Sequence, residues 1–136
     1  MIVLDASAVL PWFLAEEMDG RLDAILIRVR HEGAAVPGIW PLEVANAMRT
    51  AIRKRRMLPS QRDAALTELS RLRILVEEVS TELAWGPTLA LSDRHNLTLY
   101  DAAYLELALR RRLPLASLDA ELRAAAAAEG VIALPV

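Results

Sequence analysis

Cysteine is absent from this chain of 136 residues, and histidine occurs only twice. The absence of cysteine excludes disulfides, zinc–thiolate sites and thiol nucleophiles. His31 and His95 are too few to build a metal site from imidazoles. The candidate site that the sequence offers is made of oxygen ligands instead.

Long apolar runs are absent as well. The longest uncharged runs, such as Ala6–Ala15 and Leu83–Ser92, have ten residues, half the length of a membrane-spanning helix. No basic stretch precedes the first apolar residues, and Asp5 interrupts them, so we expect no signal peptide. The length suffices for one hydrophobic core. We therefore expect a soluble, cytoplasmic protein with a single domain, residues 1–136.

Charge is nearly balanced, with a formal net charge of −2, which argues against a general nucleic-acid coat protein. Two basic clusters stand out, Arg49–Arg56 with five basic residues and Arg110–Arg112. Beside an acidic site they would suit a polyanionic substrate; alternatively they are solvated helix ends, where basic residues are favoured. The hydrophobic share of 54% exceeds the usual value and indicates an apolar surface for a partner, although alanine explains part of it.

Short apolar runs alternate with longer segments of helical periodicity. The predicted strands are Ile2–Leu4, Ala34–Pro37, Ile74–Val79, Leu115–Ser117 and Val131–Leu134. The predicted helices are a short one around Ala6–Leu14, an amphipathic one over Leu22–Val29 that Gly33 ends, Pro41 to about Arg55, Pro59–Leu72, Ser80 to His95–Asn96, Asp101–Arg112, and Asp119–Glu129. Strands that are mostly apolar on both faces require helices on both sides. The predicted fold class is α/β, a three-layer α/β/α sandwich with a short, mostly parallel central sheet.

Four acidic residues fall where such a fold brings distant segments together. Asp5 and Asp119 directly follow predicted strands, so they lie at the carboxyl edge of the sheet, where open parallel sheets bind ligands. Glu43 and Asp101 lie near the starts of predicted helices. Carboxylates gathered within a few ångströms repel one another unless a cation neutralises them. Convergence of the four would indicate Mg²⁺ or Mn²⁺ and phosphate chemistry.

The two acids that follow strands also have structural interpretations, which stay open at this point. Asp5 and Ser7 could both cap the helical segment after the first strand. Ser7 could alternatively orient the Asp5 carboxylate. Asp119 is likewise a suitable cap for its own helix.

The two acids on helices have comparable alternatives. Glu43 and Asn46 are spaced i, i+3 and share one helical face, which could be a solvated stripe with the glutamate favoured by the helix dipole. Thr98 and Asp101 fit a capping box, a structural role that would account for both. Only the joint arrangement of the four acids therefore favours a functional site.

Four blocks of sequence, in this order, resemble PIN-domain nucleases, specifically the toxin ribonucleases of bacterial VapBC-type toxin–antitoxin modules. The resemblance runs over essentially the whole chain. The blocks are Ile2-Val-Leu-Asp-Ala-Ser-Ala8, Val36-Pro-Gly-Ile-Trp-Pro-Leu-Glu-Val-Ala-Asn46, Asn96-Leu-Thr-Leu-Tyr-Asp-Ala-Ala-Tyr104 and Leu113-Pro-Leu-Ala-Ser-Leu-Asp119. One departure is Ser117, where the family commonly has threonine; both residues carry a hydroxyl.

The resemblance implies a PIN-like fold and cleavage of RNA that depends on Mg²⁺ or Mn²⁺. It also implies a set of site residues: the catalytic and metal-binding acids Asp5, Glu43, Asp101 and Asp119, supported by Ser7, Asn46, Thr98 and Ser117. Glu43 or Asp101 would receive the proton of the attacking water. The expected partners are the RNA substrate, a cognate antitoxin and a second copy of the chain, with the helices at Leu22–Val29 and Pro59–Leu72 as candidate contact surfaces.

Two other functions are kept as alternatives. A non-catalytic PIN-like module could bind metal or RNA without turnover. An aspartyl-phosphate phosphatase could use Asp5 as its nucleophile, since that residue follows the first strand. Against the phosphatase, Ser7 stands where such enzymes have a second aspartate, and Lys54, the only lysine, lies in the wrong half of the chain.

Overall fold

A sheet of five short parallel strands forms the centre of the computed structural model, which describes residues 1–136. The strands are β1 (Ile2–Leu4), β2 (Ala34–Pro37), β3 (Ile74–Glu77), β4 (Leu115–Ala116) and β5 (Ala133–Leu134). They are arranged in the order β3-β2-β1-β4-β5, and each neighbouring pair is parallel. The predicted parallel sheet is confirmed, and β3, β4 and β5 are each one or two residues shorter than expected.

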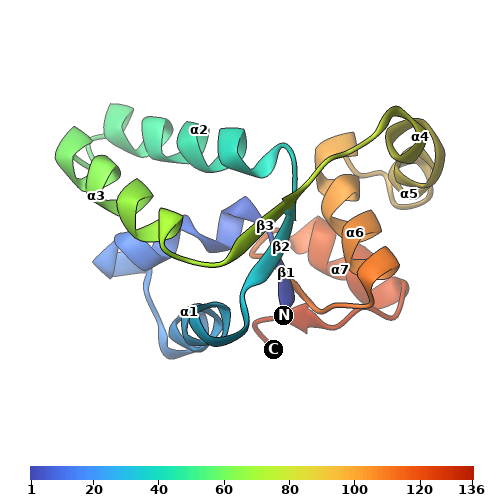
Figure 1. Ribbon diagram of the computed structural model, residues 1–136, viewed down its shortest axis with the longest axis horizontal. Helices are drawn as coiled ribbons and strands as arrows, with labels where there is room; N and C mark the ends of the chain where they lie inside the picture. The colour runs from blue at the N-terminus through green and yellow to red at the C-terminus, as the bar shows by residue number, and fades with distance from the viewer.

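Helices cover both faces of this sheet. They are α1 (Gly20–Glu32), α2 (Trp40–Arg53), α3 (Pro59–Ser70), α4 (Thr81–Leu83), α5 (Leu89–His95), α6 (Leu99–Arg111) and α7 (Ala120–Ala128). Figure 1 shows α1, α2 and α3 on one side of the strands and α4 to α7 on the other. The predicted three-layer α/β/α arrangement is therefore confirmed. None of the helices combines the length and the apolar character that crossing a bilayer requires.

The segment after β1 differs from the prediction. Instead of one short helix around Ala6–Leu14, the chain forms three 3₁₀ turns, η1 (Ala6–Ala8), η2 (Leu10–Phe13) and η3 (Ala15–Glu17). Pro11 has no backbone N–H and cannot continue an α-helical hydrogen-bond pattern from the preceding turn. The tight turns keep the chain close to the end of β1.

Chain reversals depend on residues that tolerate a positive φ. Gly33 follows α1 with a φ of 80°, and a Cβ there would lie 2.8 Å from the carbonyl oxygen of Arg73.

The helical stretch that begins after Ser80 contains a π-helical segment, η4 (Ala84–Thr88), around Pro87. It ends at Asn96 in the left-handed conformation, as the sequence predicts for this boundary.

The hydrophobic core contains 32 buried residues and lies on both faces of the sheet. β1 and β2 are buried along their full length, and α6 is buried from Ala102 to Ala108 because it packs against the central strands. β3 departs from the expectation of strands covered on both faces. It forms one edge of the sheet and leaves Val76 about half exposed.

Strand order reverses between β1 and β4. The chain runs outward from β1 through β2 to β3 and then returns to β4 on the other side of β1. Parallel sheets bind ligands outside the carboxyl ends of the strands that flank such a reversal. Leu4 is paired with Ala116, so the residues that follow them, Asp5 and Ser117, meet at this point.

Candidate active site

Asp5 lies directly after β1 and is only 5% exposed. Its side chain does not cap the 3₁₀ turn that follows, so the capping interpretation is wrong for this residue. Its Oδ2 accepts two hydrogen bonds instead, from the Ser7 hydroxyl at 2.6 Å and from the Ser117 hydroxyl at 2.7 Å. The two hydroxyls fix this carboxylate at the reversal between β1 and β4.

The same two serines also hold the loop that follows β4. The Ser7 oxygen accepts the Leu118 N–H at 2.9 Å, and the Ser117 oxygen accepts the Asp119 N–H at 3.0 Å. Asp119 caps α7, because its Oδ1 accepts the Leu122 N–H at 2.9 Å. The structural interpretation of Asp119 is therefore confirmed, and the cap places this carboxylate close to Asp5.

Glu43 enters the site from the first turn of α2. The Tyr104 hydroxyl, on α6, donates a hydrogen bond of 2.5 Å to Glu43 Oε1, and the tyrosine is fully buried. Pro41 supports this turn, since proline is favoured at the first positions of a helix. Asn46 lies one turn further along α2 and is exposed.

Asp101 enters from the first turn of α6. Thr98 caps this helix, because its hydroxyl oxygen accepts the Asp101 N–H at 3.1 Å. The cap by Thr98 is thus confirmed, whereas the reciprocal hydrogen bond from the Thr98 N–H to the Asp101 carboxylate, which would complete the predicted capping box, is not formed. Ala102 and Ala103, the two residues that follow Asp101, are buried and carry only methyl side chains.

Burial and neighbouring acidic charges raise the pKa values of Asp5, Glu43 and Asp101. Burial raises the pKa of Asp101 to about 6, and repulsion from Asp119, Asp5 and Glu43 adds to that rise. Burial also raises the pKa of Asp5, against the serine hydrogen bonds, with repulsion from Asp119 in the same direction. The structure therefore brings the four predicted acids within electrostatic reach of one another, although no three of them are as close as the ligands of one metal ion.

Glu43 shows the same balance of forces. Burial raises the pKa of its carboxyl, the Tyr104 hydrogen bond opposes that rise, and the charge of Asp5 adds to it. Burial and the Glu43 carboxylate together hold the pKa of the Tyr104 phenol well above its usual range. Tyr104 is accordingly a neutral donor at any physiological pH.

The donor set fits a hard divalent cation. Every side chain at its centre offers carboxylate or hydroxyl oxygen, the ligand type that Mg²⁺ and Mn²⁺ prefer. No three acidic or imidazole side chains lie close enough to form a complete ligand set by themselves. Mg²⁺ commonly keeps several waters and uses one or two protein carboxylates, so a looser group of acids suits it.

Two residues of this site were not among those predicted from the sequence. Tyr104 follows Asp101 by three residues, a spacing that puts both on one helical face and could have identified it. Arg123 donates hydrogen bonds to the carbonyl oxygens of Ser117 at 2.9 Å and Pro135 at 2.6 Å, which ties the loop after β4 to the chain after β5. No sequence pattern indicates that second contact.

The stability of the metal-free protein should fall as the pH rises through the range in which Asp101 ionises. The folded pKa is about 6 and the ordinary value is 3.8, so between them the folded state binds a proton that the unfolded state has lost. Protonation therefore favours folding below this range, and ionisation opposes folding above it. Because the side chain is partly exposed to solvent, we expect an effect of only about 1 kcal/mol, or about 3 °C in Tm.

Thermal unfolding in the presence of a chelator, over a pH range of about 4 to 8, measures this effect. The melting temperature of Asp101→Asn minus that of the wild type isolates Asp101 from the other acids. The difference should be small at low pH and grow until about pH 6. A difference that stays constant over the whole range would contradict the assignment.

The chain was compared with protein-family models, with curated proteins and with solved structures. The family model described as "PIN domain" matches residues 2–128. No curated protein gives a significant match.

Several solved structures share the fold. PAE2754 from Pyrobaculum aerophilum is 24% identical, with a TM-score of 0.70 over 98% of this chain and 83% of that one. A toxin–antitoxin complex from Klebsiella pneumoniae is 17% identical, with a TM-score of 0.62 over 91% of each chain. FitAcB from Neisseria gonorrhoeae is also 17% identical, with a TM-score of 0.62 over 98% of this chain and 96% of that one.

Proposed function

Because this chain belongs to the PIN-domain family, we propose that it is a metal-dependent endoribonuclease and the toxin of a VapBC-type toxin–antitoxin pair. The observation that carries the proposal is the meeting of Asp5, Glu43, Asp101 and Asp119 at the reversal of strand order. Neighbouring carboxylates repel one another. A bound cation would neutralise this repulsion and could then bind the phosphate of a substrate.

In this proposal Asp5, Glu43, Asp101 and Asp119 would hold Mg²⁺ or Mn²⁺. When bound, the cation would acidify a water molecule and offset the charge on the phosphoryl oxygens. Ser7 and Ser117 keep the Asp5 carboxylate in one orientation. Thr98 fixes the first turn of α6, and Asn46 offers an exposed amide beside Glu43.

Two residues are candidates for the general base. The attacking water gives up a proton as its oxygen bonds to phosphorus, and the leaving oxygen of the cleaved phosphodiester takes up a proton. Asp101, with a pKa of about 6, is well matched to accept a proton near neutral pH. Glu43, whose pKa is also raised, is the other candidate.

Incubation of the purified protein with total RNA tests this function. We expect cleavage with Mg²⁺ or Mn²⁺ and none with an excess of chelator, and sequencing of the new ends would identify the target. Binding of Mn²⁺ in calorimetry without any cleavage would favour the non-catalytic module instead. The phosphatase alternative has lost its support, because the family is now known.

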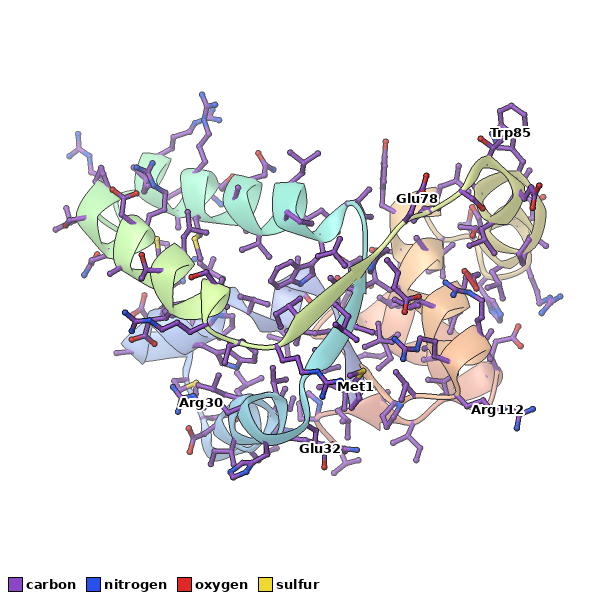
Figure 2. All side chains as sticks on the ribbon, viewed as in Figure 1. Met1, Arg30, Glu32, Glu78, Trp85 and Arg112 are labelled. Carbon is purple, nitrogen blue, oxygen red and sulfur yellow. The ribbon has the colours of Figure 1, made fainter.

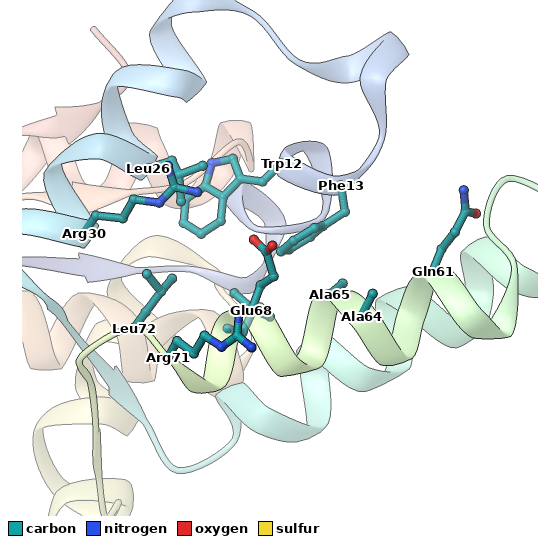
Figure 3. A pocket seen from close by; sticks show the side chains of 11 residues that line it. Trp12, Phe13, Leu26, Arg30, Gln61, Ala64, Ala65, Glu68, Arg71 and Leu72 are labelled. Carbon is teal, nitrogen blue, oxygen red and sulfur yellow. The ribbon is translucent and has the colours of Figure 1, made fainter.

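A groove lined mostly by hydrophobic residues is the proposed contact surface for the antitoxin. It has a volume of about 460 Å³ and lies between η2, α1 and α3, the last two of which contain the predicted contact segments. Figure 3 shows Trp12 and Phe13 at this groove, opposite Ala64 and Ala65 of α3. The toxin–antitoxin complex from Klebsiella pneumoniae supports a protein partner for this fold.

The partner proposal is tested in the same assay. The protein encoded by the neighbouring reading frame should suppress RNA cleavage. Ala64→Arg, which adds a long charged side chain at an exposed position of the groove, should weaken the suppression without changing cleavage itself. Unchanged suppression would place the contact elsewhere.

A homodimer is also part of the proposal. The chain leaves many large apolar side chains partly exposed, among them Leu58, Leu75, Val76 and Ile132. Sedimentation equilibrium should give twice the monomer mass of 15.0 kDa. A monomer at all concentrations would contradict this.

A further inference from the structure

The two basic clusters of the chain differ in what their charges contact. Arg110 pairs with Glu106 and Glu77, and Arg111 pairs with Glu77, so the second cluster is largely neutralised by acids of the fold. In the first cluster only Arg56 is paired, with Glu17 and Glu16. The other four basic residues form no ion pair and are exposed: Arg49, Arg53, Lys54 and Arg55.

One of these unpaired charges, that of Arg53, lies on a helical face that begins in the acidic site, and Arg49 stands one turn before it. Glu43, Asn46, Thr50 and Arg53 are spaced by three, four and three residues and so share one side of α2. The three beyond Glu43 are exposed, whereas the opposite side, with Val44, Met48 and Ala51, is buried in the core. The distance along the helix from Glu43 to Arg53 is about 15 Å.

Helix stability alone does not account for this arrangement. A basic residue in the last turn is favoured by the helix dipole, which explains Arg53. Arg49 stands four residues before it, and like charges at that spacing destabilise a helix. No acidic side chain of the protein pairs with Arg49 or Arg53. A bound anion, such as a phosphate, would relieve the repulsion between them.

We infer that the exposed side of α2 is a binding track for the RNA backbone, in which Arg49 and Arg53 contact phosphates that flank the one being cleaved. Figure 1 shows α2 leading away from the end of β2. The exposed Asn46 and Thr50 lie along this helix between Glu43 and Arg53, where an RNA strand could pass. This inference rests on the proposed nuclease function and adds a substrate contact outside the acidic centre. Phosphate contacts strengthen binding without reading the base sequence.

The salt dependence of RNA binding tests the track. The probe is a single-stranded oligouridylate of about 12 nucleotides, bound to the cleavage-deficient Asp101→Asn protein in Mg²⁺. For single strands, the slope of log K against log salt changes by about 0.7 for each phosphate contact. Adding Arg49→Ala and Arg53→Ala should therefore flatten the slope by about 1.4.

A matched control removes two unpaired charges elsewhere. Arg30 and Arg112 are exposed, form no ion pair, and are labelled in Figure 2 near α1 and at the far end of α6, away from α2. Arg30→Ala with Arg112→Asn should leave the slope within error, since asparagine tolerates the left-handed backbone at position 112. Equal slopes for both pairs of substitutions would overturn the track.

The two proposals can fail separately. If the wild type cuts RNA while Arg49→Ala and Arg53→Ala keep the full slope, the nuclease stands and the track is wrong. If the salt-dependence slope flattens as expected although the wild type cuts no RNA, the binding track is supported and the nuclease proposal is wrong.

Discussion

Replacing Asp101 with asparagine should lower the rate of RNA cleavage by about 10³-fold, the scale of losing one electrostatic contact to a reaction's developing charge. At the same time the melting temperature of the metal-free protein should rise by about 3 °C near neutral pH. Both effects have one cause, the negative charge of a carboxylate whose ionised form is destabilised by burial and by three neighbouring acids. Asparagine keeps the shape of the side chain and removes that charge.

The opposite signs of the two effects separate a functional acid from a structural one. If Asp101 served only to begin α6, the backbone N–H of residue 101 would still donate to Thr98 in the asparagine variant. Neither activity nor stability would then change much. If the site merely misfolded, both would fall. Functional centres are commonly less stable than the same fold without its charges. Asp5→Asn should also lower the rate of RNA cleavage. Its effect on stability is a balance, because the substitution removes a repelling charge but also alters the hydrogen bonds from Ser7 and Ser117.

Asp93→Asn is the matched control. Asp93 is an exposed aspartate on α5 that takes part in no ion pair, and the exchange is chemically the same. Cleavage and melting temperature should both stay within error of the wild type. Full activity of Asp101→Asn would remove this residue from the site.

The sequence predicts the fold well where apolar pattern and breaking residues agree. The predicted bounds of β1 and β2 match the observed ones, because each is a short, fully apolar run that ends at a polar residue or a proline–glycine pair. α3 begins at Pro59 as expected, since proline suits the first turn of a helix. Periodicity fails in the segment after β1, where Pro11 interrupts a pattern that otherwise resembles a helix.

The convergence of the acids is predictable only in part. Two of them follow strands, so the rule for parallel sheets places Asp5 and Asp119 at one edge. The register of β1 with β4, which puts Asp5 against Ser117, depends on packing across more than a hundred residues and is not written in either segment. The position of Glu43 depends in the same way on a contact between α2 and α6. Local patterns carry no information about such pairings.

The contact between α2 and α6 is the hydrogen bond from Tyr104 to Glu43, and removing it should be the most harmful change that leaves every acid in place. Tyr104→Phe deletes one oxygen and keeps the buried ring. Substituting the partner that orients a metal-binding group typically costs 10–100-fold in affinity or activity, so we expect a loss of about 30-fold in RNA cleavage. Mn²⁺ binding measured by calorimetry should weaken as well, which a purely structural role would not predict.

The direction of the pH effect follows from the same bond. The Tyr104 hydroxyl opposes the rise in the pKa of Glu43, so its loss should raise that pKa further. Glu43 would then need a higher pH to ionise, and the acidic limb of the pH–rate profile should move upward. Tyr100→Phe is the control, since Tyr100 lies one turn earlier on α6, is 62% exposed, and undergoes the same chemical change. If both variants kept wild-type cleavage, metal affinity and pH profile, the bond would only join two helices.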